Sequence, residues 1–274
     1  MYNIAQQNLY FNLKHIKFSD QEIVNWQNSL NFLPVRDKPW PHIEIENFLP
    51  KKIYENLISS LPEGKKSESS PSRSWVTLDT KSTKLLYFTE EEESWWGKKM
   101  LYSIRLLLIM FGNHSTFNNL RGSFKKSLND RMSVNDDEKI LVMIRVNHDR
   151  DDYHLGVHLD LPDKFLSLLI YLPLDTSNEA GGTSLYKPKS NFQSKTFDGK
   201  LIYEYLDENE FEFVKKTKFI QNSALIFPAT KDSFHGKPQK LEDFRQDRFT
   251  LQVNYYKIKL NDFNDKSIKL IQNF

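Results

Sequence analysis

The chain has 274 residues, enough for one large domain or two small ones with a full hydrophobic core. Its 38 basic and 36 acidic residues leave a net charge of +2, which excludes the strongly basic surface typical of nucleic-acid-binding proteins. Cysteine is absent, which excludes disulfides, thiolate metal sites, thiol nucleophiles and iron–sulfur clusters. We therefore expect a soluble globular protein that binds neither nucleic acid nor an anionic membrane.

No stretch of the sequence is typical of a targeting or membrane segment. Residues Met1–Phe18 mix polar with apolar side chains and have no continuous apolar run like that of a signal peptide. The most apolar run, Leu101–Phe111, contains Arg105 and is far shorter than the roughly 20 residues of a membrane span. We expect this run to form a buried helix, and the protein to be cytoplasmic.

The first 130 residues predict mostly helix. Ser19 and Glu22 fit a capping box at the start of a first helix. Pro50 suits the start of a second, and residues 94–111 and 117–128 have helical apolar spacing. Residues 42–47 read as a short extended piece, and the polar, serine-rich stretch 63–73 predicts a mobile loop.

From Lys139 onward the pattern changes to short runs of β-branched and aromatic residues, separated by turn clusters such as 178–182. The predicted strands are 140–146, 165–172, 183–186, 201–206, 211–219, 224–227 and 248–258. Strands and helices do not alternate, which favours an antiparallel sandwich or barrel. We therefore predict an α+β fold in which a helical portion, residues 1–135, packs against a β core, residues 136–274, in one compact unit.

One pair of side chains has a spacing suited to metal binding. His158 and Asp160 are two residues apart, and on a strand that spacing puts both side chains on the same face. An imidazole and a carboxylate can then bind one cation. Such pairs also arise by chance, and a second one, His42 and Glu44, is present. The pair alone therefore does not establish a metal site.

The context of His158 is more specific than the pair. An apolar strand at 165–173 follows it, and then a Gly181–Gly182 turn. A strand at 224–228 leads to His235, and the last strand alternates between apolar and polar residues from Arg248 onward. In this order of motifs, residues 141–256 resemble the iron(II)- and 2-oxoglutarate-dependent dioxygenases of the prolyl-hydroxylase-like branch. Residues 39–50 resemble the lead-in of bacterial members, which implies a structural role for His42.

The resemblance implies a double-stranded β-helix, or jelly-roll, core that holds a metal centre. His158, Asp160 and His235 match the two-histidine-one-carboxylate triad of the family, which leaves coordination positions of Fe(II) open. The implied cofactors are Fe(II), 2-oxoglutarate as cosubstrate, and O2. The implied reaction hydroxylates an unactivated C–H bond of a small metabolite or a peptidyl residue, with release of succinate and CO2.

The resemblance also implies how the cosubstrate is bound. Arg248 matches the basic residue that pairs with the distal carboxylate of 2-oxoglutarate, a role that suits the planar guanidinium. Thr250 matches the hydroxyl that the family has two residues further on, and Tyr171 matches a tyrosine that reaches the same carboxylate. The gap between His235 and Arg248 is longer than is usual in the family, and Arg245 lies within it. Arg245 is therefore the alternative partner of the carboxylate.

Two further residues are candidates for substrate contacts: Arg145, on the strand where the resemblance implies such contacts, and His154, which flanks the metal motif. The charged stretch 187–222 is either an extra hairpin over the pocket or a solvated excursion. Two other functions stay open on the residues alone. A zinc hydrolase would explain the triad but not Arg248 and its neighbours. A non-catalytic jelly-roll binding module would require neither the triad nor Arg248.

Overall fold

Helices and antiparallel strands make up the described part of the chain, an α+β arrangement. The structure is a computed structural model that describes residues 20–62, 73–79, 90–128, 138–150, 153–161, 164–175, 179–190, 192, 196–197, 200–201, 206–237 and 247–259. The helices are α2 (Gln21–Ser29), α3 (Lys51–Ile58), α4 (Glu90–Gly112) and α5 (His114–Leu128), with 3-10 turns η1 (Leu30–Phe32) and η4 (Glu208–Glu210). The strands are β1 (Ile43–Ile45), β2 (Arg73–Asp79), β3 (Glu138–Asp149), β4 (Leu155–His158), β5 (Lys164–Leu172), β6 (Ser184–Pro188), β7 (Thr196–Phe197), β8 (Lys200–Leu201), β9 (Phe211–Lys216), β10 (Ala224–Pro228), β11 (His235–Lys237) and β12 (Arg248–Lys259).

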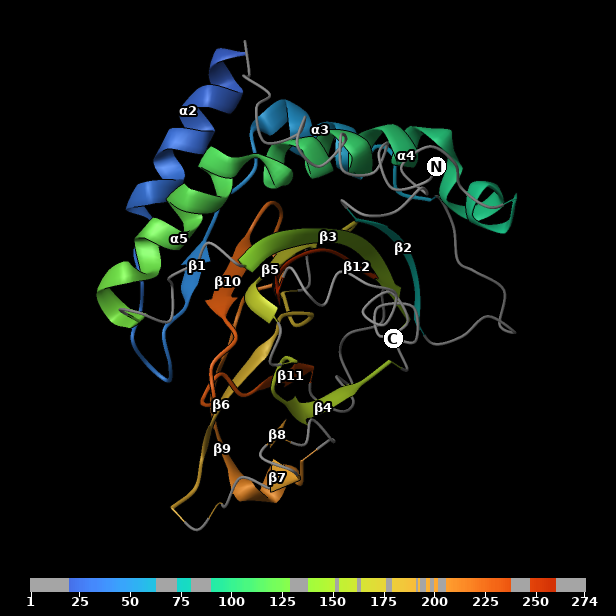
Figure 1. The fold of residues 1–274 in the computed structure, drawn as a ribbon. Coiled ribbons are helices and arrows are strands. Elements are labelled where there is room, and N and C mark those ends of the chain that lie inside the picture. Colours follow the sequence, from blue (N-terminus) through green and yellow to red (C-terminus); the bar gives the residue numbers. More distant parts are fainter. Residues whose placement is uncertain are drawn as a thin grey trace.

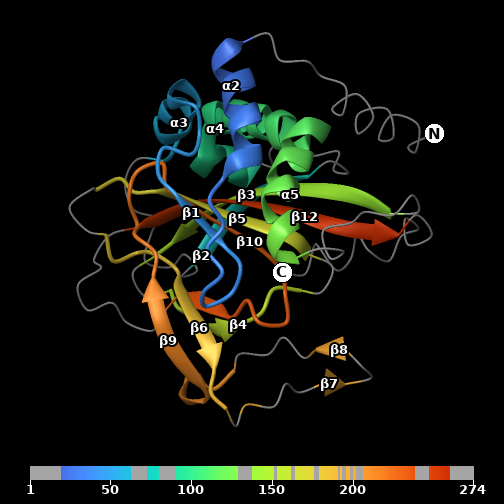
Figure 2. The same ribbon diagram turned by 90° about the vertical axis from the view of Figure 1, so that its left-hand side faces the viewer.

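The strands form two main antiparallel sheets. The six-stranded sheet has the order β1-β10-β5-β12-β3-β2 and the four-stranded sheet the order β4-β11-β6-β9, while β7 and β8 pair only with each other. Figure 1 shows the helices stacked over one side of the six-stranded sheet and the four-stranded sheet on its other side. The same layers are visible after a quarter turn in Figure 2. The six-stranded sheet is therefore the middle layer of the fold.

The main hydrophobic core lies between the helices and the middle sheet. On β12, alternate residues from Phe249 to Tyr255 belong to this core. The residues between them, from Arg248 to Asn254, point to the opposite face, because successive side chains of a strand alternate. Burying one large apolar side chain contributes about 1.5–3 kcal/mol, so packing on the sheet outweighs helix propensity in holding the helices. The polar face of β12 therefore faces the four-stranded sheet.

The start of the first helix differs from the prediction. The N-cap of α2 is Asp20, whose carboxylate accepts hydrogen bonds from the backbone N–H groups of Glu22 and Ile23. The predicted capping box of Ser19 with Glu22 is therefore wrong, and Ser19 itself lies outside the described residues. A carboxylate at this position also interacts favourably with the positive end of the helix dipole, which a serine hydroxyl does not.

The N-terminal portion contributes two strands to the middle sheet: β1 lies within the predicted extended piece 42–47, whereas β2 was not predicted. β2, at 73–79, pairs with β3 in the middle sheet, although the sequence predicted a loop up to residue 73 and no strand beyond it. The rest of that predicted loop lies outside the described residues.

Within 187–222 the structure has the β7–β8 pair and β9, which extends the four-stranded sheet along β6. Among the described helices, none is long and apolar enough to cross a lipid bilayer.

Candidate active site

Three predicted ligands come together between the two sheets. His158 ends β4, Asp160 follows it, and His235 begins β11. The two histidines are direct partners in the β4–β11 register, with ring centroids 4.3 Å apart. One ligand atom from each of the three residues lies within 4.8 Å of the other two. Two strands of one sheet thus bring residues 77 positions apart into one cluster.

Both imidazoles are oriented by the backbone of their own strands. Nδ1 of His158 lies 2.9 Å from the carbonyl oxygen of Gly156, and Nδ1 of His235 lies 2.9 Å from that of Ser233. A carbonyl oxygen only accepts hydrogen bonds, so each Nδ1 carries the proton. Each Nε2 then keeps its lone pair available for a metal ion, and the hydrogen bond at the other nitrogen fixes the ring.

The carboxylate of Asp160 is held at both oxygens. Nζ of Lys164 donates to Oδ1 at 2.5 Å, and Oγ of Ser167 donates to Oδ2 at 2.5 Å. Ser167 belongs to β5 of the middle sheet, whereas Asp160 follows a strand of the four-stranded sheet. These contacts leave the carboxylate little rotational freedom, as is typical of hydrogen-bonded carboxylate ligands.

The electrostatics favour the metal-binding protonation states. Burial and the neighbouring charge of His235 lower the pKa of His158 to about 3, and burial lowers the pKa of His235. Burial raises the pKa of Asp160, but the charge of Lys164 and, in acid, the charges of the protonated imidazoles outweigh it and lower the pKa overall. At neutral pH the cluster contains two neutral imidazoles and one carboxylate, the forms in which these groups bind metal ions.

An apolar cluster lies beside the triad on the inner face of the middle sheet. The ring centroids of Phe227 and His235 are 4.7 Å apart, and those of Trp40 and Phe227 are 5.3 Å apart. The same cluster includes Tyr171, Phe219 and Leu225. It therefore connects the histidine cluster to the region around Arg248, whose guanidinium lies over the Tyr171 ring.

Arg248 is almost fully buried at the first position of β12. Its Nε donates to the carbonyl oxygen of Gly181 at 2.6 Å, and its Nη1 donates to Oδ2 of Asp149 at 2.6 Å. Its guanidinium carbon lies 5.8 Å from the ring centroid of Tyr171 and 5.7 Å from that of Phe219. Such a buried guanidinium, with donors in a fixed plane, is suited to bind a carboxylate.

Several hydroxyl groups lie close to Tyr171, whose ring contacts this arginine. The Tyr171 hydroxyl donates to Oγ1 of Thr183 at 2.8 Å and lies 2.6 Å from Oγ1 of Thr217. Burial raises the pKa of Tyr171, which keeps the phenol protonated and able to donate. Thr250, two residues after Arg248 on the same face, accepts a hydrogen bond from Asn147 at 3.3 Å. Tyr171 and Thr250 are opposite each other in the β5–β12 register.

The Gly181–Gly182 turn shapes this region. A Cβ atom added to Gly182 would lie 1.7 Å from the backbone oxygen of Thr217, which leaves no space for any side chain. The close approach also allows the N–H of Thr183 to bond to Oγ1 of Thr217. Because Gly181 supplies the oxygen that accepts from Arg248, the turn and the arginine depend on each other.

The other predicted residues are less closely tied to the cluster. Arg145, on β3, is half-buried and lies opposite Gln252 on the polar face of β12. His154 is exposed and lies just before β4. Arg245 lies outside the described residues. His42 is buried and bonded to the Trp40 carbonyl oxygen and to Glu44, which are contacts of a structural histidine.

Sequence reasoning missed several side chains that touch the predicted ones, among them Lys164, Ser167 and Asp149. Ser167 had a detectable signal, since it is the small polar residue in an otherwise apolar buried strand. Lys164 and Asp149 had none, because charged residues next to strand ends are common. Their contacts depend on which strands pair, and the local pattern does not contain that information.

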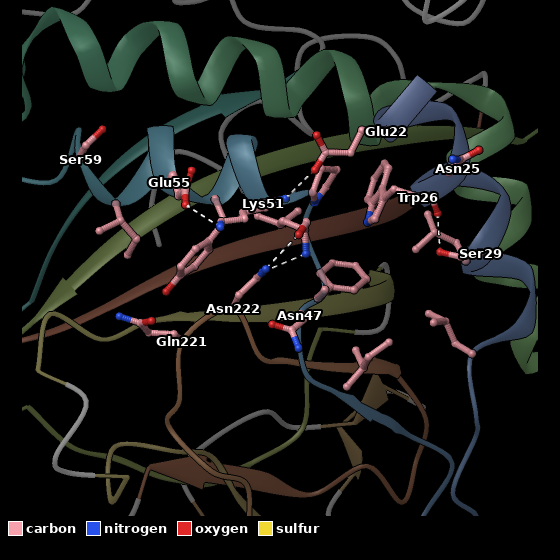
Figure 3. A pocket seen from close by; sticks show the side chains of 18 residues that line it. Glu22, Asn25, Trp26, Ser29, Asn47, Lys51, Glu55, Ser59, Gln221 and Asn222 are labelled. Carbon is pink, nitrogen blue, oxygen red and sulfur yellow. Dashed lines mark hydrogen bonds and ion pairs between the residues drawn. The ribbon is translucent and has the colours of Figure 1, made fainter. Parts of the chain in front are cut away.

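A separate hollow of about 940 Å³ lies between α2, α3 and the turn after β1 (Figure 3). Tyr54 and Asn222 contribute to its lining, which includes none of the predicted ligands or cosubstrate contacts. Some of its polar groups are bonded across the elements: Glu22 accepts from the backbone of Lys51, and the Asn222 amide bonds to both backbone groups of Leu49.

Comparisons with known proteins give only remote likenesses. No family model and no curated protein matches the chain. A Trichoplax adhaerens prolyl hydroxylase, solved with a peptide fragment of hypoxia-inducible factor, is 14% identical with a TM-score of 0.44, over 89% of this chain and 94% of that one. A Pseudomonas putida prolyl-4-hydroxylase is 11% identical with a TM-score of 0.42, over 85% and 98%. A 2-oxoglutarate–Fe(II) oxygenase-family protein from Burkholderia pseudomallei is 12% identical with a TM-score of 0.43, over 88% and 93%. Likenesses this remote assign no activity, so the function has to be inferred from the side chains of the site.

Proposed function

We propose that the protein is an iron(II)- and 2-oxoglutarate-dependent dioxygenase that hydroxylates an unactivated C–H bond. The observation that carries the proposal is the cluster of His158, Asp160 and His235, whose ligand atoms lie within 4.8 Å of one another. We further propose that the two facing sheets form a double-stranded β-helix. The helical portion, residues 1–135, and the β core, residues 136–274, then form one unit, which is supported by the pairing of β1 and β2 in the middle sheet.

The residues present fit a divalent transition metal. Two imidazole nitrogens with free lone pairs and one ionised carboxylate supply three ligands, and this donor set is suited to Fe(II) with coordination positions left for other molecules. The hydrogen bonds to Gly156, to Ser233 and from Ser167 orient the three ligands. His158, Asp160 and His235 would therefore hold Fe(II).

The residues present also fit 2-oxoglutarate. Arg248 would bind its distal carboxylate, with the hydroxyl groups of Tyr171 and Thr250 close by. The apolar cluster that includes Phe227 and Leu225 connects the triad to this anchor, and it provides a surface for the methylene groups of the cosubstrate. Bound iron and 2-oxoglutarate would together supply the chemistry that activates O2 and releases succinate and CO2.

The contribution of the chain itself is orientation and exclusion of water. Asp160 and His235 are nine-tenths or more buried, and Tyr171 is almost completely inaccessible. We propose that the substrate, a small metabolite or a peptidyl residue, enters from the side of β3. Arg145 would contact it because this side chain lies on the same inner face as Thr250 and is half-buried. His154, exposed before β4, would contact it at the rim.

The test is an anaerobic optical titration of the metal-free protein with Fe(II) and then with 2-oxoglutarate. A visible charge-transfer band is expected when both are present, because a chelated 2-oxo acid absorbs there. His235→Ala and Asp160→Ala are expected to give no band. Glu212→Ala, which removes an exposed carboxylate on β9, is the matched control and should give the wild-type band.

Absence of the band in the wild-type protein, with no Fe(II) bound, would overturn the proposal. Tight binding of Zn(II) without consumption of 2-oxoglutarate would instead support a zinc hydrolase, since the same three ligands suit catalytic zinc. That alternative leaves the buried Arg248 and its hydroxyl neighbours without a role, which is why we favour the dioxygenase.

A further inference from the structure

The guanidinium of Arg248 is held in the structure by a carboxylate of the protein itself. Asp149 and Arg248 are direct partners in the β3–β12 register, and their side chains meet at 2.6 Å. The exposed fraction of the side chain is 0% for Asp149 and 6% for Arg248. Asp149 ends β3 and Arg248 begins β12, so the pair is built into the strand register.

The contacts of Arg248 restrict both its plane and its rotation in that plane. The rings of Tyr171 and Phe219 lie within 6 Å of the guanidinium and limit its tilt. Gly181 accepts from Nε and Asp149 from Nη1, so two edges of the guanidinium are fixed at different points. A planar group bonded at two points holds its remaining N–H donors, the second on Nη1 and the two on Nη2, in a fixed plane and orientation.

We propose that Asp149 is a positioning residue, which orients Arg248 so that its remaining donors face the distal carboxylate of 2-oxoglutarate. This inference rests on the function proposed above. Asp149 has a second effect, since it compensates the buried charge of Arg248 before the cosubstrate arrives. A buried guanidinium without a partner carries a large desolvation cost and tends to reorient toward other acceptors. The anchor is therefore ready for the cosubstrate instead of being assembled by it.

The test compares 2-oxoglutarate with 2-oxovalerate, which has the same carbon chain but no distal carboxylate. Binding is measured by calorimetry on the Fe(II)-loaded protein without O2, in the wild type, Asp149→Ala and Asp149→Asn. Asp149→Ala should weaken 2-oxoglutarate binding by about tenfold or more, which corresponds to the free energy of one charge-assisted hydrogen bond. Binding of 2-oxovalerate should change by less than about threefold, because that ligand does not use the orientation of Arg248. Asp149→Asn keeps an oxygen that can accept from Nη1 and should restore most of the preference for 2-oxoglutarate.

The matched control is Glu44→Ala. Glu44 is a half-buried carboxylate on β1 that is bonded to His42 and Lys215, away from the anchor. Its loss should lower stability while leaving the ratio of the two affinities unchanged. If Asp149→Ala does not fold, Asp149→Ser takes its place, because it leaves a hydroxyl in the buried position.

The outcomes separate this inference from the function on which it rests. An unchanged affinity ratio in the truncated Asp149 variant would overturn the positioning role while the dioxygenase proposal stands. If binding of both ligands weakens equally, the ratio is again unchanged, and this result would indicate a general structural loss instead of a positioning role. A wild-type protein that binds neither ligand would overturn the dioxygenase proposal and, with it, the role of Asp149.

Discussion

Ser167 donates a hydrogen bond to Oδ2 of Asp160 at 2.5 Å, and this bond joins the two sheets at the candidate metal centre. Ser167 is completely buried in β5, while Asp160 follows β4 of the four-stranded sheet. The position of the carboxylate is therefore set by the distance between the sheets as well as by its own strand. Such partners of metal ligands contribute to metal affinity although they do not touch the ion.

Replacing Ser167 by Ala should weaken metal binding without removing it. The loss of the bond to Asp160 frees the carboxylate to rotate, and changes of this kind typically reduce metal affinity about 10- to 100-fold. Competition with a chromophoric chelator for Co(II) measures the affinity. Ser60→Ala, in the turn after α3, removes a similarly buried hydroxyl outside the site and should bind Co(II) like the wild type. Equal affinities in the two variants would contradict the role of Ser167.

The identity of the cosubstrate anchor can be tested with two arginine variants. Arg248→Ala should raise the 2-oxoglutarate concentration needed for half-maximal turnover by roughly 10- to 100-fold, because a charge-assisted pair is lost. Metal binding should not change. Arg245→Ala should behave like the wild type. If the two results are exchanged, the anchor lies three residues earlier than we propose.

Gly182→Ala should destabilise the protein strongly. The added Cβ would lie 1.7 Å from the backbone oxygen of Thr217, and a backbone atom cannot move aside as a side chain can. Overpacking of this kind typically costs about 1–3 kcal/mol, and more where the backbone has to shift. Thermal unfolding monitored by circular dichroism gives the change in midpoint temperature.

Gly122→Ala is the control for that experiment. Its added Cβ would meet only side-chain atoms of Asn31, an exposed residue that can turn away. Alanine also favours the helical conformation of α5 over glycine by about 1 kcal/mol. The midpoint of Gly122→Ala should therefore equal or exceed that of the wild type. A similar loss in both variants would show that the tight Gly182 turn has no special role.

The ionised carboxylate of Glu44 should contribute to the stability of the fold, and this contribution should be lost in acid. Burial raises its pKa, but hydrogen bonds from His42 and Lys215 outweigh this effect and hold the pKa at about 2 instead of 4.5. Because the pKa is lowered in the folded state, the contribution to the free energy of unfolding is present above pH 4.5 and is lost as the pH falls toward 2. The wild type should exceed Glu44→Gln in midpoint temperature at pH 6, and this difference should shrink at pH 3. A difference that does not depend on pH would contradict the ionic role of Glu44.

Local patterns in the sequence determined much of the fold and the candidate ligands. Alternation along 248–258 predicted β12 and its polar face, and the apolar runs predicted β3, β5 and β10 close to their observed bounds. The two-residue spacing of His158 and Asp160 predicted a shared face on a strand, and the two side chains do meet, although β4 ends at His158 and Asp160 follows it. The capping box failed because two neighbouring residues, Ser19 and Asp20, are both good N-caps, and only the structure distinguishes them.

The tertiary structure decided which of these faces meet. His158 and His235 become partners only through the β4–β11 register, and Asp149 meets Arg248 only through the register of β3 with β12. Likewise, Ser167 reaches Asp160 only because the two sheets face each other at that point. A strand pattern specifies which side chains share a face, but pairing is a long-range choice made by the packing of the whole sheet. The sequence therefore determined the set of candidate ligands, whereas the residues that orient them were decided by the fold.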